Sequence, residues 1–182
     1  MPYKQLYIFV EGPDDKRFFE NIIKPLFTSQ YDYLYFISYS TLSNAQRKNF
    51  IKSLQNQIFI DYLIIGDFDA RGNLKHCKTK CKSSITKKFG NIANNDKIFI
   101  VVEEIESWYL AGIKESKLKL YKINKYTDTQ FITKENFVSL IPKQFLSVSD
   151  FMIDILKDYS ITKAKVMNKS LNYFLTKNKL KT

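Results

Sequence analysis

The amino-acid sequence predicts an α/β fold: a parallel sheet of about four strands flanked by helices, followed by a helical C-terminal extension. The first observation is that four short segments are almost continuously apolar, which is typical of strands covered on both faces of a parallel sheet. The second is that segments with apolar residues at helical spacing alternate with these strands. The third is the composition of the 182 residues, which is 45% hydrophobic and 15% aromatic and suits one well-buried domain with a small appendage.

Each predicted strand is rich in aromatic and β-branched residues and is followed by a turn or by acidic residues. The third strand leads directly into Gly66 and Asp67, and the fourth leads into Glu103. The four strands are expected over residues 3–10, 31–39, 58–65 and 97–102.

The predicted helices carry apolar residues three or four positions apart, the spacing of one helix face. Asp14 is a suitable N-cap for the first helix, in which Phe18 and Ile22 share a face. Residues 70–90 are polar and basic with little periodicity, which indicates a loop or a short helix. Helices are expected over residues 14–27, 43–55, 105–111, 134–141, 148–159 and 161–177.

The domain organisation follows from the change of pattern after Gly112, where strands give way to helices. We see no internal repeat and no linker rich in proline, glycine and serine. The sequence therefore predicts an α/β domain over residues 1–112 and a basic helical extension over residues 113–182, packed on that domain.

The apolar segments and the cysteines indicate a cytoplasmic protein. The longest apolar runs are much shorter than the roughly 20 residues that a membrane span needs, and we expect no signal peptide and no membrane association. Cys77 and Cys81 could form half of a zinc site with His76, but no second pair would complete four ligands. We interpret them as free thiols in a reducing compartment.

The net charge of +11 is unevenly distributed. Residues 71–90 hold seven basic and no acidic side chains, and residues 113–182 hold 14 basic and six acidic ones. Such a surface attracts a polyanion, and nucleic acid is the partner we expect. The alternative, a solvated surface in a protein that simply uses many lysines, stays open on charge alone.

Acidic residues follow three of the four predicted strands. Glu11 follows the first strand, Asp67 and Asp69 follow the third, and residues 103–106 (EEIE) follow the fourth. In an open parallel sheet ligands bind beyond the carboxyl ends of the strands, so these carboxylates are expected to converge. Clustered carboxylates repel one another unless a cation neutralises them, and hard oxygen ligands suit Mg²⁺ or Mn²⁺. The alternative is that they are cap and turn residues, since aspartate is common after strands.

Three segments at these strand ends resemble the Toprim domain. Residues 10–15 (VEGPDD) resemble its first signature, a hydrophobic strand followed by Glu-Gly and then Asp. Residues 64–69 (IIGDFD) resemble the second, a hydrophobic strand followed by Asp-x-Asp. Residues 101–111 (VVEEIESWYLA) resemble a Glu-Ile-Glu-x-Trp signature of compact Toprim-like proteins that are often found near phage-defence genes. The resemblance covers about residues 5–112.

The resemblance implies a Rossmann-like Toprim sheet and assigns roles to individual residues. Toprim domains occur in topoisomerases, primases, ribosomal-RNA maturation ribonucleases and the overcoming-lysogenisation-defect (OLD) class of nucleases. By this resemblance, Glu11 is a metal ligand or general acid/base, and Asp67 and Asp69 form a magnesium-binding pair. Asp15 lies where the nuclease branch has a further ligand, and Glu106 is a candidate second-metal or supporting carboxylate.

A carboxylate-bound Mg²⁺ or Mn²⁺ beside a basic surface suits phosphodiester hydrolysis, so we expect a nuclease acting on DNA or RNA, in the setting of phage defence. The alternative is a non-catalytic nucleic-acid-binding subunit, or one that works only with a separate ATPase. The sequence gives no indication of the oligomeric state. Basic side chains that follow the Asp-x-Asp motif are expected to hold the nucleic-acid backbone. They are Arg71, Lys75, Lys78, Lys80, Lys82, Lys87 and Lys88.

Overall fold

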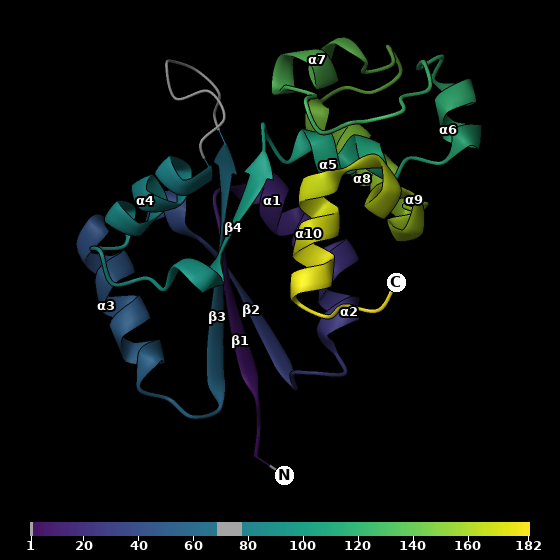
Figure 1. Cartoon of the computed structure of the whole chain (residues 1–182). Coiled ribbons are helices and arrows are strands. Elements are labelled where there is room, and N and C mark those ends of the chain that lie inside the picture. The colour runs from purple at the N-terminus through teal and green to yellow at the C-terminus, as the bar shows by residue number, and fades with distance from the viewer. Residues whose placement is uncertain (1, 69–77) are drawn as a thin grey trace. The chain divides into compact units, whose positions relative to one another are not determined.

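A computed structural model of the chain describes residues 2–68 and 78–182 (Figure 1). It confirms the predicted parallel α/β sheet flanked by helices, with helices in the C-terminal part. Within the described residues the sheet has four strands in the order β2-β1-β3-β4. The strands are β1 (Gln5–Val10), β2 (Tyr33–Ser38), β3 (Ile60–Phe68) and β4 (Ile98–Val102).

The register of the sheet aligns the carboxyl ends of β2, β1 and β3. Phe9 of β1 lies opposite Ile37 of β2 on one side and opposite Ile64 of β3 on the other. Because all three strands are parallel, the residues that follow these positions emerge at one edge of the sheet. This is the edge at which the sequence predicts a carboxylate site.

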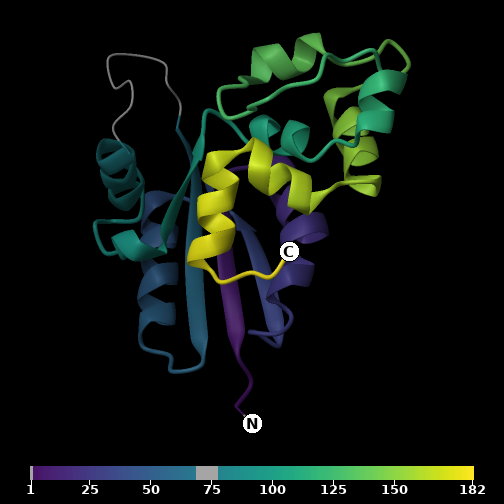
Figure 2. The same cartoon turned by 45° about the vertical axis from the view of Figure 1, so that its right-hand side comes forward.

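Helices cover both faces of this sheet. Figures 1 and 2 show α1 and α2 on one face and α3 and α4 on the other. The bounds are α1 (Pro13–Phe18), a π-helical turn η1 (Phe19–Ile23), α2 (Lys24–Phe27), η2 (Tyr39–Thr41), α3 (Asn44–Gln55), α4 (Lys78–Lys88) and η3 (Asn95–Lys97).

The first helix begins earlier than the sequence suggests. Gly12 is the N-cap of α1 and Pro13 is its first residue, so the prediction of Asp14 as N-cap is wrong. Proline suits the first helical position because its missing N–H would have no intrahelical partner there. Asp14 instead lies inside the first turn, where its Oδ1 accepts a hydrogen bond from Arg17 Nη1 at 2.5 Å.

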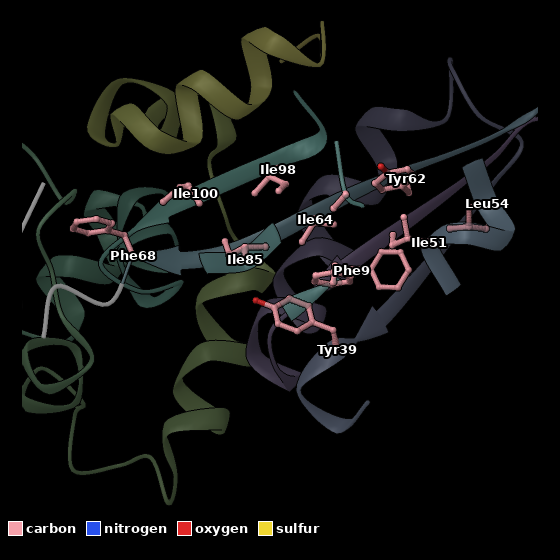
Figure 3. Close-up of a cluster of buried hydrophobic side chains, with 12 residues drawn as sticks. Phe9, Tyr39, Ile51, Leu54, Tyr62, Ile64, Phe68, Ile85, Ile98 and Ile100 are labelled. Carbon is pink, nitrogen blue, oxygen red and sulfur yellow. The ribbon is translucent and has the colours of Figure 1, made fainter. Parts of the chain in front are cut away.

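Helix α4 occupies part of the segment in which we expected a loop or short helix. Its inner face carries Cys81 and Ile85, and Phe89 directly after the helix continues the same spacing of four residues. Ile85 and Phe89 are buried against Phe9 and Tyr39 in a core cluster shown in Figure 3. The cluster consists of Phe9, Tyr39, Ile51, Leu54, Tyr62, Ile64, Phe68, Ile85, Phe89, Ala93, Ile98 and Ile100.

The chain divides into two compact units, Met1–Ile100 and Val101–Thr182. The sequence predicts a domain boundary after residue 112, whereas residues 101–112 belong to the second unit. The reason is aromatic packing: Trp108 lies against Phe174 with ring centroids 5.8 Å apart, and Tyr109 lies 6.5 Å from Phe137. The helices of this unit are α5 (Glu106–Ala111), α6 (Glu115–Leu120), α7 (Lys134–Ser139), α8 (Val148–Lys157), α9 (Ile161–Met167) and α10 (Lys169–Lys177).

A buried polar network divides the last predicted helix into two. Asn168 interrupts the helix expected over residues 161–177, and its side chain accepts a hydrogen bond from Leu171 N at 3.0 Å, which caps α10. Ser170 Oγ donates to Asn168 Oδ1 at 2.7 Å and accepts from Trp108 Nε1 at 2.8 Å. The tryptophan of the Glu-Ile-Glu-x-Trp segment is thus a core residue of the second unit.

None of the helices in the described ranges is long and apolar enough to cross a membrane.

Candidate functional site

Two candidate carboxylates lie at the carboxyl edge of neighbouring strands in the first unit. Glu11 follows the last residue of β1, and Asp67 is the penultimate residue of β3. Phe9 lies opposite Ile64. Glu11 comes two residues after Phe9, and Gly66, the residue before Asp67, comes two residues after Ile64. The structure therefore brings Glu11 and Asp67 to the same stretch of the sheet edge. Asp67 still belongs to the strand, although the sequence predicts that the strand ends at residue 65.

Each oxygen of the Glu11 side chain faces a different group. Oε2 accepts a hydrogen bond from the hydroxyl of Tyr39 at 3.2 Å. Oε1 lies 4.0 Å from Nζ of Lys88, the last residue of α4. The Glu11 side chain is 39% exposed, so solvent or a ligand can also reach it.

Tyr39 is a residue of this edge that the sequence analysis did not single out. It follows β2 directly and is only 1% exposed, with its ring 5.3 Å from that of Phe89 in an edge-to-face arrangement. Burial raises the pKa of Tyr39 well above its usual value, and the negative charges of Glu11, Asp67 and Asp15 raise it further. The hydroxyl is therefore a proton donor to Glu11, and as a buried phenol it is a poor nucleophile.

Asp15 has a structural role beside the site. It is 5% exposed, and its Oδ2 accepts a hydrogen bond from the backbone N–H of Gly12 at 3.1 Å. This contact fixes the start of α1 directly after Glu11. The implied role of Asp15 as a further metal ligand stays a prediction, and one of its oxygens already serves the helix cap.

Asp67 is linked to α4 through Cys81. The free thiol of Cys81 donates to the backbone carbonyl of Asp67 at 3.5 Å. Burial raises the pKa of the Cys81 thiol; the Lys88 ammonium opposes this, and the charges of Asp67 and Glu11 add to it. The charges of Glu11 and Asp67 thus both act on Cys81 and on Tyr39.

The lysines of α4 do not share one role. Lys80 and Lys87 are exposed, and Lys88 lies beside Glu11 with its Nζ 6.0 Å from the centre of the Tyr39 ring. Lys82 instead donates to the backbone carbonyl of Asn95 at 2.7 Å, so it secures α4 to the segment before β4.

Several predicted residues lie outside the described residues: Asp69 of the magnesium pair, and Arg71 and Lys75 of the basic segment. Lys78 is the first residue of α4.

The donor set can be compared with what a metal ion needs. Glu11 and Asp67 offer the hard oxygen donors that suit Mg²⁺ or Mn²⁺, and Oδ1 of Asp67 is shielded from solvent. In residues 2–68 and 78–182, however, no three Asp, Glu, His or Cys side chains are grouped so that they could hold a metal ion. The chemistry of Glu11 and Asp67 fits such an ion, and they could supply two of its ligands.

The acidic residues after β4 belong to the second unit. Glu103 adopts a φ of 60°, a left-handed conformation that is uncommon for residues other than glycine. Glu104 Oε2 accepts a hydrogen bond from Lys134 N at 2.6 Å, at the first residue of α7. Glu106 is buried, and its Oε1 lies 4.0 Å from Lys134 Nζ. Lys134 therefore binds both acids, and a metal role for Glu106 stays a prediction.

A family model matches more than half of the chain. The family model described as a domain of unknown function (DUF4276) matches residues 10–150. The chain belongs to the DUF4276 family. Searches of curated proteins and of solved structures found no match to the chain.

The stretch shared with the DUF4276 family contains the whole candidate site. Residues 10–150 include the end of β1, the residues after β2, the end of β3 and helix α4. They also include the Glu104–Lys134 contact of the second unit. The features from which we argue function therefore lie in the part of the chain that defines the family.

Proposed function

We propose that the chain is a Mg²⁺- or Mn²⁺-dependent nuclease of the Toprim type that hydrolyses phosphodiester bonds of DNA or RNA in the cytoplasm. The observation that carries this proposal is the hydrogen bond of Glu11 to the buried Tyr39 hydroxyl, with Asp67 at the end of the neighbouring strand β3, at the carboxyl edge of a parallel sheet. Ligands of open parallel sheets bind at this edge. The resemblance of the same strand ends to Toprim signatures supports the assignment and extends the proposal to phage defence.

The electrostatics of this edge favour a cation. Burial raises the pKa of Tyr39, the charges of Glu11, Asp67 and Asp15 raise it further, and Lys88 is a basic group close to Glu11. Clustered carboxylates stay ionised at low energetic cost when a cation lies between them. Glu11 and Asp67 would hold this cation, with Asp69 as a further candidate ligand by the Toprim resemblance.

The residues of the site would share the work of hydrolysis. A bound divalent cation supplies charge stabilisation for the phosphate and lowers the pKa of the attacking water. Glu11 is placed to orient that cation or to accept a proton from water, because one of its oxygens is fixed by Tyr39. Lys80, Lys87 and Lys88 of α4 would bind phosphate groups of the substrate on either side of the scissile bond.

A second candidate function is a nucleic-acid-binding subunit that is inactive alone and depends on a partner such as an ATPase. One observation favours it: among the described residues no group of three metal-ligating side chains is assembled. The two functions differ in what the carboxylates do. In the binding subunit they would shape the edge electrostatically without taking part in catalysis.

A cleavage assay separates the two candidates. The full chain would be incubated with labelled single- and double-stranded DNA and RNA, with Mg²⁺, with Mn²⁺ and with chelator. We expect metal-dependent cleavage of at least one substrate and a loss of at least 100-fold in rate in the Glu11→Gln and Asp67→Asn variants. Nucleic-acid affinity should change little, since the lysines stay in place.

The matched control is Asp61→Asn, which alters an aspartate of the same strand as Asp67 at the opposite edge of the sheet. Asp61 forms an ion pair with Lys97 at 2.6 Å and lies outside the candidate site. Cleavage that persists in the Glu11→Gln and Asp67→Asn variants would contradict the proposal. Salt-sensitive binding without any cleavage would favour the binding subunit.

A further inference from the structure

We infer that Tyr39 is a positioning residue for Glu11, holding one carboxylate oxygen through its hydroxyl so that the other stays directed to the site. The contact is the 3.2 Å hydrogen bond from Tyr39 to Oε2 of Glu11. Oε1 then remains on the side of Lys88, whose Nζ lies 4.0 Å away. This inference rests on the proposed function, because it concerns the same carboxylate.

The surroundings of Tyr39 fix the position of its hydroxyl. Its backbone carbonyl accepts a hydrogen bond from Arg47 Nη1 of α3 at 3.0 Å. The ring packs edge-to-face on Phe89 with centroids 5.3 Å apart, inside the core cluster of Figure 3. The next residue is also tied to the site, because Ser40 N donates to the backbone carbonyl of Glu11 at 3.3 Å. A donor held in this way restricts the rotamers of the carboxylate that it binds.

Such a contact supports a carboxylate that binds a metal ion. Hydrogen bonds from neighbouring side chains orient metal ligands, and removing them typically lowers metal affinity or activity by about 10- to 100-fold. Tyr39 is 1% exposed, so substrate does not reach its hydroxyl. Its contribution must therefore pass through Glu11.

The test is Tyr39→Phe, which keeps the aromatic packing and removes only the hydroxyl. We expect kcat to fall by about 10- to 100-fold, while KM for the nucleic acid stays within about threefold. The affinity for Mn²⁺, measured by calorimetry in the absence of nucleic acid, should fall by about tenfold or more. This binding measurement does not depend on activity.

The chain offers a closely matched control in Tyr31→Phe. The Tyr31 hydroxyl donates to Asp61 Oδ2, also at 3.2 Å, at the opposite edge of the sheet. Both variants lose one phenol-to-carboxylate hydrogen bond of the same length, so a loss of stability from that bond alone should be similar in the two. Only Tyr39→Phe should change kcat and Mn²⁺ affinity. If both quantities fall more in Tyr39→Phe than in Tyr31→Phe, a loss of stability does not explain the difference.

A second variant separates positioning from a general disturbance of the core. In a Glu11→Gln background the carboxylate is gone, so Tyr39→Phe should change the remaining Mn²⁺ affinity by less than about twofold. Equal kcat and Mn²⁺ affinity in Tyr39→Phe and Tyr31→Phe, with an active wild type, would overturn the inference alone. A wild type that neither cleaves nucleic acid nor binds Mn²⁺ would overturn the proposed function.

Discussion

At the residue scale, Gly66 shows how closely α4 and Tyr39 approach β3. A Cβ atom at this position would overlap Cδ1 of Ile85 and would lie 3.2 Å from both Ile85 Cγ1 and the Tyr39 hydroxyl oxygen. Glycine is needed here for space, because a larger residue would push apart the groups that surround the candidate site. The glycine of the IIGDFD segment thus has a packing role next to Asp67.

We predict that Gly66→Ala destabilises the protein by about 1 to 3 kcal/mol, the usual cost of overpacking a core. It should also weaken cleavage, because the Tyr39 hydroxyl is one of the displaced groups. Urea unfolding monitored by circular dichroism measures the stability. Adding Ile85→Val removes the overlapping Cδ1 atom and should recover part of the loss.

Gly12→Ala is the control for this substitution. A Cβ atom at Gly12 meets Oδ2 of Asp15 at 3.7 Å, an ordinary contact, and we expect a change within about 1 kcal/mol. If the Gly66→Ala variant were as stable as the Gly12→Ala variant, this result would contradict the close packing of Ile85 of α4 against Gly66 of β3.

The sequence predicts some residues of the site and not others, for a physical reason. Glu11 directly follows an apolar strand and Asp67 lies at the end of another. A charged residue in such a position can be recognised from the sequence alone as a candidate for the site. The chain has 12 tyrosines and 15 phenylalanines, most of which are expected to belong to the core, and the sequence does not distinguish Tyr39 from the rest. Only the register of β2 beside β1 brings its hydroxyl to Glu11, and that register depends on tertiary structure.

At the scale of elements, α4 presents lysines on different sides. Lys80 and Lys87 are exposed and seven residues apart, which places them on one side of the helix. Lys82 is bound to the carbonyl of Asn95. The helix therefore combines a side suited to phosphate contacts with a side that secures it to the first unit.

We predict that Lys80→Gln/Lys87→Gln weakens nucleic-acid binding and makes it less sensitive to salt. Each lost phosphate contact should lower the slope of log K against log salt concentration by about 0.7 to 0.9. Fluorescence anisotropy titrations at several salt concentrations measure both quantities. Lys82→Gln removes the same type of charge and should leave affinity and slope close to those of the wild type. An equal loss in Lys82→Gln would show that only total charge matters.

The elements themselves were largely predictable. All four strands and most helices lie where apolar periodicity places them, because burial dictates that pattern. The break at Asn168 was missed, since helical spacing of apolar residues continues across it into α10. Asn168 ends one helix and caps the next by accepting a hydrogen bond from Leu171 N, and its side chain also bonds Ser107 and Ser170. The spacing of apolar residues does not reveal these hydrogen bonds.

At the scale of the whole molecule, the match to one family model includes parts of both compact units. The match to the DUF4276 family runs from residue 10 to residue 150, across the end of the first unit at Ile100. The first unit contains Glu11, Tyr39 and Asp67 of the candidate site. In the second unit, Lys134 contacts both Glu104 and Glu106. The unit boundary was not predictable from composition, because the aromatic contacts of Trp108 and Tyr109 determine it.

The proposed nuclease site requires that Glu11 and Asp67 bind the same divalent cation. The most direct test is calorimetric titration of Mn²⁺ into the wild type, Glu11→Gln, Asp67→Asn and the double variant, with Asp61→Asn as control. We expect each single substitution to weaken binding by about tenfold or more, and the double variant to lose less than the product of the two, because both residues serve one site. A wild type that binds no Mn²⁺, or single variants that bind it with wild-type affinity, would contradict a shared cation site at Glu11 and Asp67.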